Sequence, residues 1–458
     1  IRDRNYIEPQ TFQDFFSPEY LNQYFRENLI IRNGGGKDGM TPIVFWKNYQ
    51  KQIPIIAKKC REGNYHFATY NEQLILKGRD KLPRVISIPT IRDRLVLGVL
   101  NKYLQKTFPE CVCHDVPNRH IKVIKDFIKR NCQTEISFLK TDFKSFYDNI
   151  NQKKLLNKLS SKIKENHALL LIKKAIQTPT GPVTSKSLKI NKNGVPQGLA
   201  ISNILAGIYM EHFDKFFSNS PNTLYIRYVD DILILQTNKS ITPKNIKQYL
   251  VNNKLKLTLS KEKTEKGVIG INTIDFIGYV FTAKCISIRK KNINNLINRL
   301  ANLCTMFKKE YDNSNRLLFN GNNEQYKIYF EKELNMLISG FKYESHCYGW
   351  LPYYRSMNDI ALLYHLDIIL KEKLLPPEIN PSSIHSFVQS YYELMNYGGG
   401  RLILDFNKMT TIPEKTAFLR KMGILRLDKD YSNKDINLAF ERYIRHKKKQ
   451  VEENIGYI

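Results

Sequence analysis

The chain has 458 residues and a formal net charge of +29, from 72 Lys and Arg against 43 Asp and Glu. Its hydrophobic fraction of 42% and aromatic fraction of 12% exclude an intrinsically disordered chain, and its length predicts two to four structural units. No apolar run approaches the ~20 residues that span a bilayer, and the first residues lead into no signal-peptide-like segment. The positive charge favours a polyanionic partner such as nucleic acid, with a Lys-rich composition bias as the alternative.

Seven cysteines are scattered along the chain without a CxxC pair, which favours a reducing compartment. The run Cys111-Val112-Cys113-His114 is arranged like half of a metal site. No second half-site follows at a suitable spacing, so a structural metal is not predicted there.

The first third of the chain predicts helices with one strand-rich interruption. Helical segments are expected up to about residue 60, around a glycine-rich turn at 34–39, and again over 91–132. Between them, the texture of residues 65–89 is typical of strands.

The middle of the chain carries the clearest local signals. A short strand is expected over 136–141, ending on Asp142, and a helix from about Gln197 to Phe217. Residues 224–235 read as two apolar strands joined by a tight turn, which predicts a hairpin.

The last part of the chain predicts short strands and then mostly helices. The strands are expected over 255–288, and the helices from about residue 292, with an Asn-rich loop at 311–325. Prolines at 376, 377 and 381 mark a break before a final helical unit.

The hairpin at 224–235 has an acidic tip, Asp230-Asp231. Two adjacent carboxylates repel each other unless a cation neutralises them. An ordinary surface turn is the alternative, but Tyr228 and Val229 are poor turn residues and the flanking strands are too apolar for an open loop.

A third carboxylate, Asp142, ends a strand 88 residues before Asp230. Three carboxylates together would form an oxygen-rich site for hard divalent ions, typically Mg²⁺, with Mn²⁺ as a substitute. Two such ions ~3.5–4 Å apart catalyse in-line phosphoryl transfer. The sequence therefore predicts a two-metal site formed by Asp142, Asp230 and Asp231.

The pattern Tyr-x-Asp-Asp at 228–231, after Asp142 and Tyr147, resembles the palm of reverse transcriptases. Further motifs of that family follow one another in its order between about residues 30 and 358. They are Lys37-Asp38-Gly39-Met40-Thr41, Pro83 to Thr90 with Arg92-Asp93-Arg94-Leu95, Gly194 to Ser202, Leu257 to Thr264, Phe276-Ile277-Gly278-Tyr279 and Tyr348-Gly349-Trp350-Leu351.

The resemblance implies metal-binding roles. Asp142 and Asp230 are expected to ligate the ions directly, and Asp231 to ligate them or lie beside them. The carbonyl of Phe143 is expected to help hold the nucleotide-bound metal.

The resemblance also implies a nucleotide site. Arg84 is expected to bind the triphosphate, because a guanidinium pairs bidentately with phosphate oxygens; a surface Arg is the alternative. The ring of Tyr147 would lie under the sugar and exclude a 2′-hydroxyl, with a core Tyr as the alternative. Gln197 and Gly198 should lie against the nucleotide, and Lys263 is either the acid that protonates pyrophosphate or a solvated Lys.

Nucleic-acid contacts are implied for Arg94 and for the primer-grip residues Phe276, Gly278 and Tyr279. For Arg94, an ion pair with Asp93 or another acid is equally expected.

The implied fold class is α+β, a right-hand polymerase with an antiparallel palm sheet and an added C-terminal helical domain. The expected domains are fingers at 1–135, palm at 136–283, thumb at 284–358 and a C-terminal helical domain at 359–458.

Departures from the family pattern narrow the choice of subgroup. Ser202-Asn203 stands where intron and retron enzymes usually have Ser-Pro, and 113–120 departs from the usual fingers pattern. No Cys/His nuclease cluster follows the thumb, and the chain's last helical unit ends in a basic run, 445–449, which reads as a solvated helix end.

This combination is similar to bacterial defence-associated reverse transcriptases, a set that includes abortive-infection enzymes. It implies a cytoplasmic RNA-directed DNA polymerase with a cognate non-coding RNA template, a DNA product and dNTPs as partners, and no membrane. The C-terminal helical domain is a candidate for RNA binding or homo-oligomerisation. The alternatives are a group II intron-encoded maturase, a non-catalytic RNA-binding scaffold and, disfavoured by Tyr147, a viral RNA polymerase.

Overall fold

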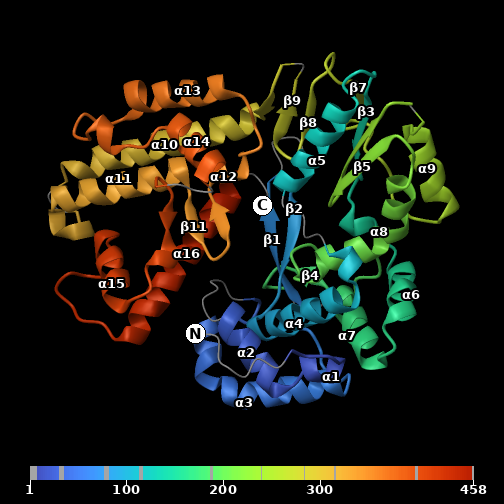
Figure 1. The fold of residues 1–458 in the computed structure, drawn as a ribbon. Coiled ribbons are helices and arrows are strands. Elements are labelled where there is room, and N and C mark those ends of the chain that lie inside the picture. Colours follow the sequence, from blue (N-terminus) through green and yellow to red (C-terminus); the bar gives the residue numbers. More distant parts are fainter. Residues whose placement is uncertain are drawn as a thin grey trace. The chain divides into compact units, whose positions relative to one another are not determined.

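The computed structural model describes residues 8–29, 36–76, 82–112, 117–185, 189–238, 240–282, 284–313, 316–397 and 401–455. The chain divides into two compact units, the first formed by residues 1–114 and 137–266 and the second by 115–136 and 267–458 (Figure 1). Within the described residues, no helix is both long enough and apolar enough to cross a membrane. The four-domain division expected from the sequence stays a prediction.

The first unit combines helices with two small sheets. Its helices are α1 (Phe12–Phe15), α2 (Pro18–Asn28), α3 (Pro42–Arg61), α4 (Ile91–Thr107), η1 (Pro109–Cys111), η2 (Tyr147–Asn149), α6 (Gln152–Lys162), α7 (Asn166–Gln177), α8 (Ser202–Ser218) and α9 (Pro243–Asn252). Its strands are β1 (Tyr70–Ile75), β2 (Arg84–Ile88), β3 (Ser137–Asp142), β4 (Thr180–Gly181), β5 (Thr223–Tyr228) and β6 (Asp231–Gln236), and β7 (Glu265–Val268) lies at its boundary.

The larger sheet of this unit has the strand order β5-β6-β3-β7, and β3, β5 and β6 pair antiparallel. The central strand β6 is almost wholly buried, which explains its unbroken apolar run Ile232 to Leu235. Ile232 and Ile234 belong to a core that also takes in α4, α6 and α8. The sheet is thus anchored on helices, so the residues at its strand ends are held in place.

The smaller sheet has the order β2-β1-β4, with β1 and β2 forming an antiparallel hairpin. Strand β2 leads directly into α4, whose first turn is capped by the Thr90 side chain. Behind that cap, Asp93 is buried and accepts hydrogen bonds from the Tyr65 hydroxyl, the Thr90 hydroxyl and the Ala68 N–H.

The second unit is mostly helical, as expected from the sequence. Its helices are α5 (Pro117–Arg130), α10 (Lys290–Tyr311), η3 (Leu318–Gly321), α11 (Asn323–Ser339), α12 (Trp350–Tyr353), α13 (Ile360–Ile368), η4 (Ile369–Leu374), η5 (Pro381–Ser383), α14 (Phe387–Tyr397), η6 (Phe406–Lys408), α15 (Ile412–Lys421) and α16 (Asn433–Ile455). Its strands are β8 (Ile274–Phe276), β9 (Tyr279–Phe281), β10 (Ile286–Ile288), β11 (Phe341–Tyr343), β12 (His346–Tyr348) and β13 (Leu404–Asp405).

The last helix, α16, is docked within the second unit by its basic residues. Lys447 forms an ion pair with Glu333, in which each side chain is 12% exposed. Lys448 lies 4.4 Å from the ring centre of Tyr343 and 4.6 Å from that of Tyr348. The interpretation of this run as a solvated helix end is therefore wrong for these two lysines, because both serve in packing.

The helix expected from Gln197 begins instead at Ser202. Gly198 has a φ of +98°, which a helix does not accommodate, and the Ser202 N–H closes a turn onto the carbonyl of Leu199. The residues before Ser202 are thus a loop that leads into the first turn of α8.

Candidate active site

Strand register brings the three predicted carboxylates together. Asp142 at the end of β3 pairs with Asp231 at the start of β6, and Asp231 also pairs with Tyr228 on β5. Asp230 therefore lies in the turn of the β5–β6 hairpin, and its carbonyl accepts a hydrogen bond of 3.2 Å from the Phe143 N–H. The turn and the end of β3 are thus joined through the backbone.

The turn itself is held in an uncommon conformation. Val229 has a φ of +58°, in the left-handed region that a β-branched residue rarely adopts. The Arg227 guanidinium stabilises it by donating to the Val229 carbonyl at 2.7 Å, while its Nε donates to Asp214 on α8 at 2.8 Å. The sequence analysis missed this brace, because nothing local marks Asp214 as the partner of a strand residue.

Asp142 is buried and has a cationic partner, whereas Asp230 and Asp231 are half-buried. Asp142 is 2% exposed, and its Oδ2 accepts a hydrogen bond from the Lys263 ammonium. Its Oδ1 is buried and has no hydrogen-bond partner among the described residues. A buried carboxylate oxygen left in this way is costly unless a cation or donor occupies the space beside it.

The pKa values of the two hairpin carboxyls are raised. Burial is the main cause for Asp231, followed by the charges of Asp230 and Asp142, and together they raise its pKa to about 6. Burial and the Asp142 charge also raise the pKa of Asp230, although Lys263 and Arg84 oppose them. Burial is the larger cause of both shifts and repulsion from neighbouring carboxylates the smaller one, and a bound divalent cation would oppose both.

The donor set fits magnesium. Carboxylate oxygens are the ligands that hard divalent cations prefer, and the partnerless Oδ1 of Asp142 offers one of them. Asp142, Asp230 and Asp231 are the residues that would hold the ions. The part expected of the Phe143 carbonyl stays a prediction.

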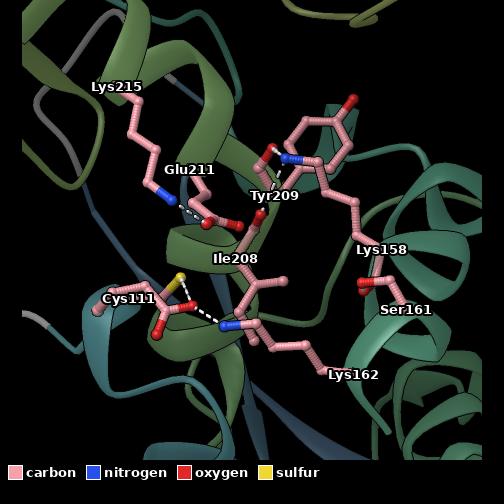
Figure 2. Close-up of polar contacts among 9 residues, drawn as sticks. Cys111, Lys158, Ser161, Lys162, Ile208, Tyr209, Glu211 and Lys215 are labelled. Atoms are coloured by element: carbon pink, nitrogen blue, oxygen red, sulfur yellow. Dashed lines mark hydrogen bonds and ion pairs between the residues drawn. The ribbon is translucent and has the colours of Figure 1, made fainter. Parts of the chain in front are cut away.

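A second group of acidic residues lies elsewhere in the first unit, where ligand atoms of Glu110, Cys111 and Glu211 come within 4.8 Å of one another (Figure 2). Lys162 pairs with Glu110, and Lys215 donates to Glu211 at 2.6 Å. Burial, with the charges of both glutamates, raises the pKa of the Cys111 thiol to about 12. Lys162 and Lys215 already neutralise the two carboxylates, and Cys111 stays a protonated thiol at neutral pH.

Arg84 and Tyr147 lie within electrostatic reach of the Asp142, Asp230 and Asp231 carboxylates. Arg84 is an exposed residue on β2, and its positive charge opposes the rise in the pKa of Asp230. Burial, and then the charge of Asp230, raises the pKa of Tyr147 to about 12, so the Tyr147 hydroxyl is protonated at neutral pH. Their predicted roles, with phosphate and sugar, are compatible with these positions.

Gln197 and Gly198 lie against β2. The Gln197 carbonyl accepts from the Ser87 N–H at 2.7 Å, and its side-chain amide donates to Asp148 at 3.4 Å. A Cβ on Gly198 would come within 2.7 Å of Ile86 and 3.0 Å of the Ser87 carbonyl. The close backbone approach expected of Gly198 is thus made to β2, and its contact with a nucleotide stays a prediction.

A cavity of about 440 Å³ opens on the Val85 and Ser87 side of β2, and its lining includes Gln197, Asp148 and Lys192. Gln197 thus borders an open space as well as β2.

Two of the predicted basic contacts are engaged within the protein. Lys263 pairs with Asp142, and that hydrogen bond and charge outweigh burial and raise the pKa of Lys263. The Arg94 Nε donates to the Pro89 carbonyl at 3.0 Å. Asp93, suggested as an ion-pair partner for Arg94, bonds Tyr65, Thr90 and Ala68 instead.

The predicted primer-grip residues lie in the second unit. Phe276 is 1% exposed and Tyr279 0% exposed, and the Tyr279 hydroxyl donates to Asn118 and to the Tyr353 carbonyl. Direct nucleic-acid contact by these two side chains is incompatible with their burial. Ile277 and Gly278 form the turn between them with positive φ and are buried as well, so nucleic-acid contact by Gly278 stays a prediction.

Comparison with known proteins identifies a family for this part of the chain. Residues 75–281 match the family model described as reverse transcriptase (RNA-dependent DNA polymerase). The chain is 27% identical to the group II intron-encoded protein LtrA of Lactococcus lactis over 195 residues, which cover 42% of this chain and 32% of LtrA. It is 32% identical to an uncharacterized 91 kDa protein in the cob intron of Schizosaccharomyces pombe over 227 residues, 48% of this chain and 28% of that protein.

Among solved structures, the telomerase of Candida albicans in complex with a fragment of telomeric RNA aligns with a TM-score of 0.42 and 14% identity. That alignment covers 89% of this chain and 67% of the telomerase.

Residues 75–281, which contain all three carboxylates, are therefore a reverse transcriptase domain, and the α+β right-hand polymerase class expected from the sequence is confirmed. Within that class, the domain is related to the group II intron-encoded enzymes. The chain matches about a third of the length of these two curated relatives.

Proposed function

We propose that this chain is an RNA-directed DNA polymerase that extends a primer with dNTPs. The observation that carries the proposal is the carboxylate group formed by Asp142, Asp230 and Asp231, with its raised pKa values and partnerless oxygen. Bound Mg²⁺ would supply activation of the primer 3′-hydroxyl and stabilisation of charge on the phosphates.

The chain's own residues supply positioning. Asp142, Asp230 and Asp231 hold the negative field to which the cations bind, and the Arg227 brace keeps the hairpin turn in place. Arg84 would pair with triphosphate oxygens, and Tyr147 would exclude a ribose 2′-hydroxyl. Lys263, which pairs with Asp142, would exchange that contact for one with pyrophosphate and give it a proton.

The test is primer extension by the purified chain on matched RNA and DNA templates, with dNTPs and either Mg²⁺ or Mn²⁺. The proposal expects extension on RNA, and its loss on replacing both Asp230 and Asp231 by Ala. Glu110→Gln with Glu211→Gln is the matched control, because it removes two carboxylates from the lysine-neutralised cluster of the same unit. Full-rate synthesis by the Asp230/Asp231 variant would overturn the assignment.

For the biological role, we propose cDNA synthesis on a cognate non-coding RNA in bacterial anti-phage defence, in the cytoplasm. The departures at Ser202-Asn203 and 113–120 support this choice. That unit, residues 359–458, is our candidate for RNA binding or for homo-oligomer formation.

The second candidate is a group II intron maturase, which the similarity to LtrA favours. Sequencing of the RNA and DNA bound to the protein in cells separates the two. One dominant small RNA with complementary DNA supports the defence role, whereas bound intron RNA supports the maturase. Diverse RNA without DNA, even when dNTPs and Mg²⁺ are supplied, would instead indicate a non-catalytic scaffold.

A further inference from the structure

The first turn of α8 is fastened to both segments expected to line the nucleotide site. The Tyr147 hydroxyl donates a hydrogen bond of 2.5 Å to the Oδ1 of Asn203. The neighbouring Ser202 is buried, and its hydroxyl donates to the Pro196 carbonyl at 2.6 Å. Two consecutive residues of one helix therefore hold the tyrosine ring and the loop that carries Gln197.

The backbone of Tyr147 is held by that same loop. Its carbonyl accepts from the Val195 N–H at 2.9 Å. The loop approaches so closely that a Cβ on Gly194, which has a φ of +72°, would lie 2.7 Å from the carbonyl oxygens of Tyr147 and Asp148. Tyr147 is thus fixed at its backbone by Val195 and at its hydroxyl by Asn203, with the ring spanning the space between them.

We propose that Asn203 is a positioning residue for sugar selection, holding the ring of Tyr147 where it blocks a ribose 2′-hydroxyl. This inference rests on the polymerase function proposed above. A steric barrier is only as effective as its resistance to displacement, and the ring cannot turn aside without breaking its bond to Asn203.

The position of Asn203 supports a role outside the core. Its side chain is exposed, so its amide is not required to fill the interior. A proline, the usual residue here in the intron and retron enzymes that the sequence resembles, fits the first turn of a helix but has no side-chain oxygen to accept the Tyr147 bond. Asn203 therefore supplies a contact that a proline at this position would not make.

The inference is tested by single-nucleotide incorporation of dATP and of ATP opposite uridine, with kcat/KM measured for each. The variants are Asn203→Ala, Tyr147→Phe and both together, which remove the acceptor, the donor and the whole bond. Asn203→Asp keeps an acceptor oxygen at the same place. Asn219→Ala is the matched control, because it removes an exposed amide from the far end of the same helix.

We expect Asn203→Ala to lower the preference for dATP over ATP by roughly two- to tenfold, the range for loss of one neutral hydrogen bond. Tyr147→Phe should lower this preference by the same factor, and the double variant should lower it no further. Asn203→Asp and Asn219→Ala should keep the wild-type preference. An unchanged preference in Asn203→Ala, or equal losses with both nucleotides, would overturn the inference and leave Asn203 a structural residue.

A second readout does not depend on catalysis. Because one bond joins the two side chains, the shifts in unfolding midpoint of Asn203→Ala and Tyr147→Phe should be non-additive in the double variant. Strict additivity would overturn the inference whether or not the chain polymerises. Absence of any incorporation by the wild-type chain, with non-additive unfolding shifts, would reject the proposed function and retain the contact.

Discussion

Two acidic clusters in the first unit differ in how their charge is balanced. Glu110 and Glu211 each pair with a lysine, and hydrogen bonding to Lys162 lowers the pKa of Glu110. In the other cluster, Lys263 pairs with Asp142, and the pKa values of Asp230 and Asp231 are raised. Carboxylates alone therefore do not indicate a metal site; a cluster in which burial and neighbouring charge raise the carboxyl pKa values is the better candidate.

Exchanging carboxylates for amides should separate the two clusters most strongly. We expect Asp230→Asn with Asp231→Asn to lower primer extension by at least about a thousandfold, because the metal ions supply several kcal/mol of charge stabilisation. Glu110→Gln with Glu211→Gln should stay within about twofold of wild type. Primer-extension rates measure both, and equal losses in the two variants would remove the distinction.

The basic residues that support the two regions should differ in how much they contribute to the free energy of unfolding. Arg227 and Asp214 have side chains that are 11% and 29% exposed, so breaking this pair by Arg227→Gln should cost about 3 kcal/mol of unfolding free energy. Arg227→Gln should also lower the rate of primer extension, because the hairpin turn loses the hydrogen bond from Arg227 to the Val229 carbonyl.

The matched change in the other cluster is Lys215→Gln, where the lysine is 62% exposed and the expected cost is below about 1 kcal/mol. Urea unfolding measures the loss of unfolding free energy in both variants. A cost for Lys215→Gln as large as that for Arg227→Gln would contradict the contrast between a braced turn and a surface pair.

The dependence of stability on pH should have opposite signs in the two clusters. The pKa of Asp231 is raised from 3.8 to about 6, so in metal-free protein its contribution is present at low pH and is lost as pH rises between those values. The pKa of Glu110 is lowered from 4.5, so its contribution is present above that value and is lost as pH falls through the folded-state pKa.

Unfolding midpoints between pH 2 and 7 in metal-free buffer test these signs. Asp231→Asn should remove the decline in stability between about pH 4 and 6. Glu110→Gln should remove the loss of stability that occurs as pH falls through the folded-state pKa of Glu110. Parallel pH profiles for the two variants would show that the clusters are balanced alike.

The sequence predicted the placement of the three carboxylates well because its signals are local. A strand that ends on Asp142 and a hairpin with Asp230-Asp231 at its turn both appear in the structure, in register with each other. The register itself, which pairs Asp142 with Asp231, depends on long-range strand pairing that no local pattern specifies.

What the sequence missed depends on contacts between distant residues. The partner of Arg227 is Asp214 on α8, and Asn203 was noticed only as a departure from a motif. The burial of Tyr279 likewise follows from packing within the second unit, where its hydroxyl reaches Asn118. Such side-chain assignments require the fold, because the residues concerned carry no signal in their own neighbourhood.

The helix expected from Gln197 failed for a local reason. Apolar residues continue through Leu199 and Ile201, but Gly198 turns the chain with a positive φ and the loop packs on β2. Hydrophobic periodicity marked the segment and did not reveal where the helix begins.

Titration of the metal-free chain with Mn²⁺, followed by electron paramagnetic resonance of the free ion, tests the central claim most directly. The account predicts binding by the wild-type chain and by Glu110→Gln with Glu211→Gln, and at least about a hundredfold weaker binding by Asp142→Asn. Undiminished binding in Asp142→Asn, or its loss only in the glutamate variant, would contradict the assignment of the metal site to Asp142, Asp230 and Asp231.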